Sequence, residues 1–299
     1  MKKDTLVRGV ARESRVRVFA CDTTVLTNYA QSKHSLWPVA SAALGRTMSV
    51  GCIMGSMLKT DKEKITIQIN GGGPIGTVMV DAYANGKVRG FVANPEVHYI
   101  YNDTGKLAVG VAVGHQGYLK VIKDMGLKQP WIGQVELQTG EIGEDFSYYF
   151  TVSEQIPSAV SVGVLVNPEN EVIASGGLVI QVLPEALDED ISYIEEKLKK
   201  FPPVSTLISE GKTPQDMISM IFDDFKLLEE RELWFECNCS RDKCLTVLDT
   251  IILSDLKDMI DEDHKCDMFC EFCSTNYHFD EKDLMAIYER RYVYEKDRS

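Results

Sequence analysis

The sequence has no run of about eighteen apolar residues, the length that a helix needs to cross a bilayer. Its first twenty residues are basic, but the apolar stretch of a secretory signal does not follow them. We therefore expect a soluble, cytoplasmic protein with no membrane partner. Structural disulfides are rare in that compartment, so clustered thiols there more often bind metals or carry out redox chemistry.

Common enzyme motifs are also missing. No Gly-Lys-Ser/Thr follows the glycines of GGGPIG at residues 71–76, so this stretch predicts a tight turn between strands rather than a phosphate-binding loop. No H-E-x-x-H pair is present, and no histidine stands in a recognisable nucleophile motif. The adjacent Glu144 and Asp145 would not face each other on a helix, and they are typical of a helix N-terminus. We expect no enzymatic turnover.

The whole chain has a net charge of −13, and basic residues fail to balance acidic ones mainly in its C-terminal part. Residues 1–184 hold 17 basic and 16 acidic side chains, whereas residues 185–299 hold 15 basic and 29 acidic ones. An acidic field repels phosphate backbones, so nucleic acid is not an expected partner. A basic or unfolded protein is easier to accommodate.

The first 183 of the 299 residues predict one α+β domain with a large, mainly antiparallel sheet. The apolar, Ala- and Met-rich run at 36–58 predicts a buried helix beginning near Pro38, and Gly51 and Gly55 on it would admit a close neighbour. Glu144–Gln155 predicts a second helix. Period-2 alternation and turn residues predict strands at 65–69, 78–82, 87–92, 106–113, 118–122 and 133–139, and a further strand pair over 158–183.

Residues 184–233 predict a helical linker. Short, charged segments with helical spacing are separated by proline and glycine, and Thr213-Pro214-Gln215-Asp216 has the pattern of a capping box. Such helices bury little apolar surface among themselves, so we expect a metastable segment that leans on a neighbouring domain.

Six of the eight cysteines lie between residues 237 and 273. Cys237 and Cys239 form C-x-C, and Cys270 and Cys273 form C-x-x-C about thirty residues later. Two close pairs can supply four thiolates to a tetrahedral zinc, and the small unit at 234–299 would draw on the metal for folding free energy. The sequence thus predicts one Zn²⁺ per chain.

Other ligand sets stay open at this point. Cys266, Cys270 and Cys273 have i, i+4, i+7 spacing, so one helix could present all three, and Cys244 is a further thiol nearby. His264 and His278 are close enough in sequence to compete. Cys21 and Cys52 lie in apolar surroundings and are expected to be small buried hydrophobic residues.

The chain resembles the redox-regulated heat-shock protein 33 family, the 33 kDa chaperonin. The resemblance covers nearly the whole chain: the cysteine pattern is followed by YHF, and WPVASAALGRTM, INGGGPIG, GQVELQTGEIGEDFSYYFTVSEQIPSAVSVGVLVNP and FECNCSRDK are similar to stretches of that family. It implies that Cys237, Cys239, Cys270 and Cys273 are the zinc thiolates. Cys244 and Cys266 have no place in that four-cysteine pattern.

The resemblance also implies a function. Oxidation would form the disulfides Cys237–Cys239 and Cys270–Cys273, release zinc and unfold the zinc unit with its linker. The exposed surface would capture unfolding client proteins without ATP, and the oxidised form would be a homodimer. The apolar linker residues expected to contact clients are Ile191, Ile194, Leu198, Met217, Met220, Ile221, Phe222 and Phe225.

Two other functions remain as alternatives. Cys270-Glu-Phe-Cys273 alone is typical of a thiol–disulfide oxidoreductase, although its sequence context is not that of a βαβ unit. A zinc ribbon that never switches is the other. For a redox switch, repulsion between a four-thiolate zinc centre and the acidic residues around it would favour opening; these are Asp261, Glu262, Asp263, Asp267 and Glu271.

Overall fold

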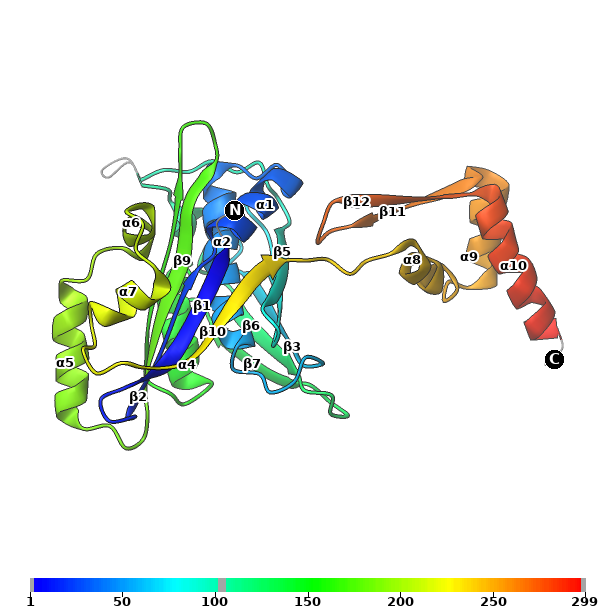
Figure 1. Cartoon of the computed structure of the whole chain (residues 1–299). Helices are drawn as coiled ribbons and strands as arrows, with labels where there is room; N and C mark the ends of the chain where they lie inside the picture. The colour runs from blue at the N-terminus through cyan, green and yellow to red at the C-terminus, as the bar shows by residue number, and fades with distance from the viewer. Residues whose placement is uncertain (1–2, 102–105, 297–299) are drawn as a thin grey trace. The chain divides into compact units, whose positions relative to one another are not determined.

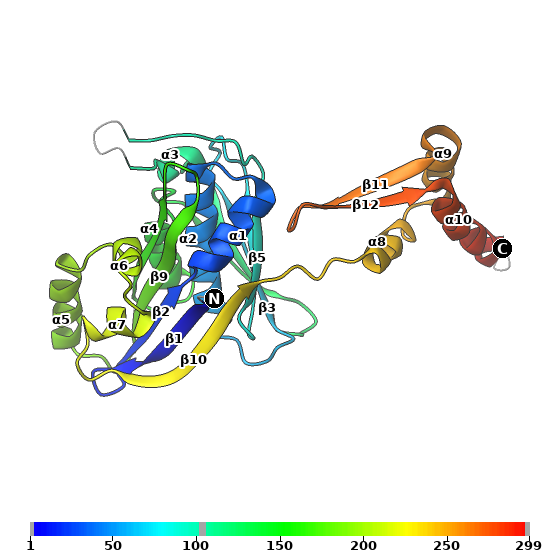
Figure 2. The ribbon, with the colours of Figure 1, turned by 45° about the horizontal axis from the view of Figure 1, so that its top comes forward.

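The computed structural model of the protein describes the backbone of residues 3–101 and 106–296, and side chains as far as Tyr292. It contains two compact units, Met1–Glu236 and Cys237–Ser299 (Figures 1 and 2). No helix in the described part of the chain is long and apolar enough to span a membrane.

The first unit is built on a ten-stranded sheet in the order β7-β6-β3-β4-β5-β10-β1-β2-β9-β8. Neighbouring strands are antiparallel, apart from a short parallel pairing between β5 and β10. The expected α+β fold with a large, mainly antiparallel sheet is therefore confirmed. The strands are β1 (Asp4–Ala11), β2 (Val16–Asp22), β3 (Lys64–Asn70), β4 (Val78–Tyr83), β5 (Lys87–Val92), β6 (Tyr118–Asp124), β7 (Trp131–Glu136), β8 (Ser158–Val166), β9 (Val172–Val182) and β10 (Lys226–Phe235).

Helix α2 (Pro38–Gly55) forms the centre of the larger core and begins at the expected proline. It packs against β4 and β5 in one half of the sheet and against β8 and β9 in the other, so the sheet curves around it. A Cβ atom on Gly51 would lie 3.0 Å from Val80, and one on Gly55 would lie 2.9 Å from the Tyr83 carbonyl oxygen. These two glycines thus allow the close approach of β4. The other helices beside this core are α1 (Thr24–His34), α3 (Val109–Val113) and α4 (Gly143–Val152).

The prediction of a strand at 106–113 is wrong in its second half, because Val109–Val113 form helix α3. Val109, Ala112 and Val113 are fully buried and lie three and four residues apart, which fits one face of a helix. A short apolar run does not distinguish a buried strand from a buried helical turn.

The segment 184–233 contains three helices that cover the other face of the sheet at β1, β2 and β9 (Figure 1). They are α5 (Asp188–Lys199), α6 (Val204–Ser209) and α7 (Pro214–Ser219), and the capping box at Thr213 is present. The prediction of a helical segment is wrong at its end, where β10 begins at Lys226 and pairs with β1. Charged Glu229 and Arg231 occupy the inward positions of that strand, so its period-2 pattern is not apolar.

The second unit is smaller and has its own core. It contains α8 (Arg241–Leu248), α9 (Leu253–Asp258), a π-helical turn (Met259–Asp263), the hairpin β11 (Lys265–Cys270) and β12 (Thr275–Asp280), and α10 (Glu281–Lys296). The idea that one helix presents Cys266, Cys270 and Cys273 is wrong. Cys266 and Cys270 share one face of strand β11, because an even spacing also repeats on a strand, and Cys273 lies in the turn after it.

Candidate metal centre

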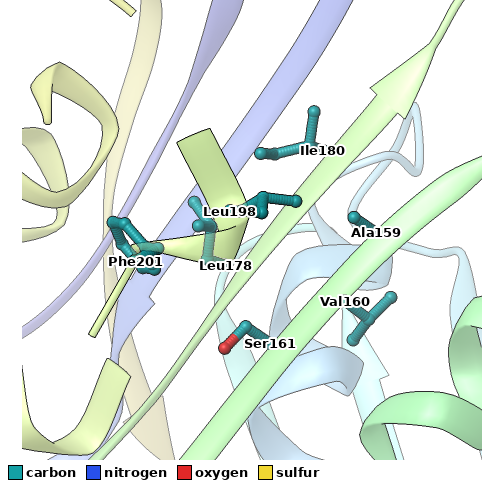
Figure 3. Close-up of a pocket in the computed structure, with 7 residues that line it drawn as sticks. All are labelled: Ala159, Val160, Ser161, Leu178, Ile180, Leu198 and Phe201. Atoms are coloured by element: carbon teal, nitrogen blue, oxygen red, sulfur yellow. The ribbon is translucent and has the colours of Figure 1, made fainter. Parts of the chain in front are cut away.

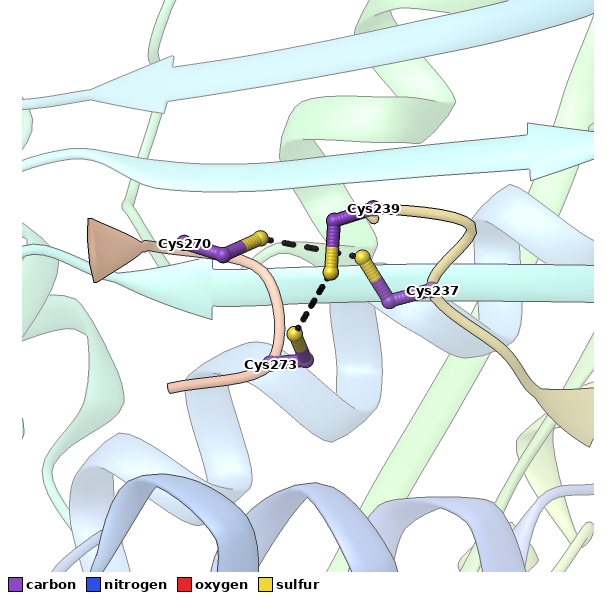
Figure 4. A group of neighbouring side chains, drawn as sticks. All are labelled: Cys237, Cys239, Cys270 and Cys273. Carbon is purple, nitrogen blue, oxygen red and sulfur yellow. Dashed lines mark hydrogen bonds between the residues drawn. The ribbon is translucent and has the colours of Figure 1, made fainter. Parts of the chain in front are cut away.

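The four cysteines of the C-x-C and C-x-x-C pairs meet in the second unit (Figure 4). Their Sγ atoms all lie within 4.8 Å of one another. The nearest approaches join the two pairs: 3.7 Å between Cys237 and Cys270, and 3.2 Å between Cys239 and Cys273. Among the residues that the structure describes, these four cysteines are the one group of three or more His, Cys, Asp or Glu side chains placed to hold a metal ion.

Local structure explains why the sulfurs converge. Cys270 ends β11, and the backbone N–H groups of Cys273 and Ser274 both donate to its carbonyl oxygen, which closes a tight turn around the second pair. Ser274 has a positive φ of 55° in that turn. The first pair precedes α8, whose N-terminus is capped by the Ser240 hydroxyl accepting from the Lys243 N–H.

The donor set fits a tetrahedral metal ion. With metal–sulfur bonds of about 2.3 Å, a zinc tetrahedron places its sulfurs about 3.8 Å apart. The Cys237–Cys270 separation matches that edge, and the others are at most 4.8 Å. Four sulfur donors are typical of structural zinc or iron–sulfur sites rather than of sites for hard cations such as Mg²⁺ or Ca²⁺.

The environment of each sulfur affects how readily its thiol ionises. Burial raises the pKa of Cys270, and it also raises that of Cys239, against the opposing effect of the Tyr277 hydroxyl. Burial acts the same way on Cys273, but hydrogen bonds from Thr275 and Cys239 outweigh it and lower the pKa of Cys273 to about 7. Among these three thiols, Cys273 therefore gives the most thiolate at neutral pH.

Two hydroxyl groups that the sequence did not single out contact the sulfurs. The Tyr277 hydroxyl lies 3.1 Å from Cys239 Sγ, and the Thr275 hydroxyl lies 3.2 Å from Cys273 Sγ. Both residues belong to β12. Tyr277 is the tyrosine of the YHF stretch, but a pattern of letters does not reveal which sulfur its hydroxyl reaches.

The other candidate ligands lie outside this group of sulfurs. Cys244 and Cys266 are half-buried against the second unit's apolar core. His264 is 3.4 Å from a Glu281 oxygen, and His278 is 2.8 Å from an Asp267 oxygen. Cys21 and Cys52 are buried in the first unit, as expected.

Comparisons with known proteins agree with one another. A family model described as Hsp33 protein matches residues 4–280. The 33 kDa chaperonins of Bacillus cereus (strain AH187) and Bacillus anthracis (strain A0248) are each 45% identical over 289 residues, which are 96% of this chain and 99% of theirs. This chain belongs to the Hsp33 family. The crystal structure of the 33 kDa chaperonin (heat shock protein 33 homolog) from Thermotoga maritima matches with a TM-score of 0.90 at 33% identity, over 98% of this chain and 100% of that one. The molecule is thus an Hsp33-family chaperone.

In this Hsp33-family chain, most of the linker residues expected to contact clients are covered. Ile194, Met217, Ile221 and Phe222 are buried, and Leu198 and Phe225 are half-buried. The last two, Ile191 and Met220, are exposed. The apolar side of the linker therefore faces the sheet rather than solvent.

A small apolar cavity lies where α5 meets the edge strand β8 (Figure 3). Its volume is about 220 Å³. Leu198 of α5 and the nearby Phe201 form one side, and the β8–β9 pair forms the other. The residues from those two strands are Ala159, Val160, Ser161, Leu178 and Ile180.

A buried carboxylate fastens α5 to the turn between β1 and β2. Asp190 is fully buried and accepts hydrogen bonds from Arg12 Nε and Arg15 Nε, each at 2.7 Å, and from the Leu187 N–H at 3.0 Å. Hydrogen bonds from Arg15 are the main cause that holds the pKa of Asp190 well below its usual value. The same turn also contacts the linker beyond α7, because the backbone N–H of Arg12 donates to the Asp224 carboxylate.

Proposed function

We propose that this Hsp33-family protein is a cytoplasmic, redox-regulated holdase: inactive when reduced and zinc-bound, and active without ATP after oxidation. The observation that carries the proposal is the group of four sulfurs within 4.8 Å of one another. Cys237, Cys239, Cys270 and Cys273 would hold one zinc ion. When bound, zinc keeps the four sulfurs deprotonated and ties the two cysteine pairs together.

Oxidation begins at a thiolate. A cysteine thiolate attacks peroxide, forming a sulfenic acid and releasing hydroxide; a second thiolate then displaces hydroxide from that sulfur and forms a disulfide. Two thiolates lose two electrons, which peroxide accepts. The oxidised sulfurs can no longer serve as anionic ligands.

Which sulfurs pair decides whether the unit opens. We propose Cys237–Cys239 and Cys270–Cys273, because bonds within each pair leave the two chain segments free to separate. Bonds between the pairs would instead lock those segments together. Sulfurs of different pairs lie 3.7 and 3.2 Å apart, close enough to form the bonds between pairs instead. Peptide mapping of the oxidised protein distinguishes the two sets of disulfides.

Opening of the second unit would then destabilise the linker. We assign residues 1–183 to the chaperone core, 184–233 to the metastable linker and 234–299 to the switch. Within the linker, α5–α7 are the part that we expect to leave the sheet, since β10 is paired along its length with β1. Their departure would uncover apolar surface on both sides, including Val16 and Val18 of β2. On the linker it would uncover the six covered residues, which are Ile194, Leu198, Met217, Ile221, Phe222 and Phe225, and add them to the already exposed Ile191 and Met220. Unfolding proteins would bind there, and an oxidised homodimer would enlarge the surface.

The test is a zinc titration of the reduced protein, with thiols counted before and after peroxide. We expect one zinc per chain, its release on oxidation, loss of four thiols, and suppression of aggregation of a heat-unfolded client in the oxidised form alone. A variant with Cys244→Ser and Cys266→Ser is the matched control and should behave like the parent chain. Zinc that survives peroxide indicates a permanent zinc ribbon, and turnover of a dithiol substrate indicates an oxidoreductase; either contradicts the proposal.

A further inference from the structure

One face of strand β12 carries three side chains toward the interior of the second unit. Phe279 is fully buried in the small apolar core, and Tyr277 and Thr275 follow at intervals of two on the same face. The register places Tyr277 opposite Met268 and Thr275 opposite Cys270 of β11. The strand that completes the core thus also brings two hydroxyl groups to the cysteine cluster.

Each hydroxyl meets a different sulfur. Tyr277 is 3.1 Å from Cys239 Sγ, and Thr275 is 3.2 Å from Cys273 Sγ. The Tyr277 hydroxyl donates to Cys239 Sγ, whereas Cys273 Sγ, as a thiol, donates to the Thr275 hydroxyl oxygen. A metal-bound thiolate has no proton and can act only as an acceptor, so with a metal bound the Thr275 hydroxyl would have to donate instead. One sulfur of each cysteine pair would then receive a hydrogen bond from β12.

We propose that Tyr277 and Thr275 are positioning residues that set how fast the cluster reacts with peroxide. This inference rests on the proposed zinc-bound, peroxide-sensitive state. A donated hydrogen bond withdraws electron density from the thiolate that would attack the oxygen–oxygen bond, and it fixes the direction of the sulfur lone pairs. The two hydroxyls thereby raise the oxidant level at which the switch responds.

The test compares full-length Tyr277→Phe and Thr275→Val with matched controls in the same unit. Tyr292→Phe removes a hydroxyl from an exposed tyrosine of α10, and Thr250→Val removes one that donates to the Val247 carbonyl. Zinc release by peroxide is followed with a chromogenic zinc indicator. We expect zinc release to be about tenfold faster in Tyr277→Phe, because losing a group that hydrogen-bonds a metal ligand typically weakens metal binding by about that factor. The acceleration should be smaller in Thr275→Val, and both controls should release zinc at the parent rate.

A second measurement separates hydrogen bonding from simple loosening of the fold. With Co²⁺ as the probe metal, loss of a donor raises the energy of the sulfur electrons, so the sulfur-to-cobalt charge-transfer band should move to lower energy in both test variants. Placing 3-fluorotyrosine at position 277 gives a more acidic hydroxyl of nearly the same size. We expect it to move the band to higher energy and to slow zinc release.

The outcomes distinguish this inference from the function on which it rests. If the parent chain binds zinc and releases it with peroxide, but the test variants match their controls in rate and band position, the role of the hydroxyls is wrong and the redox switch stands. Faster release with an unmoved band would also overturn it, since that result indicates a structural effect. If the parent chain binds neither metal, both ideas fail.

Discussion

The two units of this protein secure their folds in different ways. The first buries aliphatic and aromatic side chains in two clusters on the faces of a ten-stranded sheet. The second has one cluster of six buried residues: Leu248, Leu256, Ile260, Phe279, Leu284 and Ile287. So small a core is expected to contribute only a few kcal/mol beyond the entropy of the chain, so in the proposed function bonds through the four sulfurs would decide the stability of this unit. We therefore predict that a chemical signal at sulfur acts on the second unit and spares the first.

The largest expected effect is that of metal removal. A strong chelator applied to the reduced protein should unfold the second unit and leave the first intact, because a four-sulfur zinc site supplies roughly 10 kcal/mol or more of folding free energy. Hydrogen exchange measured by mass spectrometry should show lost protection in β11 and β12 and retained protection in β3 and β4. Unchanged protection in the β11–β12 hairpin would show that its core suffices.

The next largest effect should come from the contact between linker and sheet. Phe222 is buried there, whereas Met220 is exposed two residues earlier. Phe222→Ala should cost about 3–5 kcal/mol of local stability, and Met220→Ala should stay within about 0.5 kcal/mol. We expect faster proteolysis of 184–225 and client binding by the reduced protein in Phe222→Ala alone. Equal proteolysis rates in the two variants would mean that the linker is already detached.

A smaller effect is expected for the buried carboxylate on α5. Asp190→Asn keeps the size of the side chain but removes the charge that pairs with Arg12 and Arg15, and it should destabilise the linker by about 2 kcal/mol. Because the folded state lowers the pKa of Asp190, its contribution is complete above the unfolded value and is lost as the pH falls through the folded value.

The pH dependence follows from that sign. The difference in proteolysis rate between the parent chain and Asp190→Asn should stay constant from pH 7 to about 5 and shrink only below about 4. Glu189→Gln, next to it and exposed, is the matched control. A difference that already fades near pH 6 would point to a histidine instead.

The fold could be predicted where the pattern was apolar and regular. The helix at Pro38 followed from an apolar, Ala- and Met-rich run, the strand at Ile65–Ile69 followed from period-2 alternation, and the meeting of four cysteines followed from two close pairs. Strand β10 did not, because charged residues occupy its inward side, where Glu229 forms ion pairs with Arg8 and Arg231. The contact between Tyr277 and Cys239 was equally hidden, since it depends on the register of β12 with β11.

The smallest effect should come from the acidic surface of the second unit. We expect slower zinc release by peroxide when its charges are neutralised as Asp261→Asn, Glu262→Gln, Asp263→Asn, Asp267→Asn and Glu271→Gln. Two of these already have cationic or potentially cationic partners, since Asp261 is 3.2 Å from Lys257 Nζ and Asp267 is 2.8 Å from His278 Nδ1. Exposed charges are screened beyond about 8 Å at physiological salt, so the change in release rate should be about twofold there and larger at low salt.

Neutralising as many exposed carboxylates in the first unit, such as Glu96 and Glu169, should leave the rate of zinc release unchanged. If both sets act alike, the acidic residues influence the whole molecule's net charge rather than the cluster.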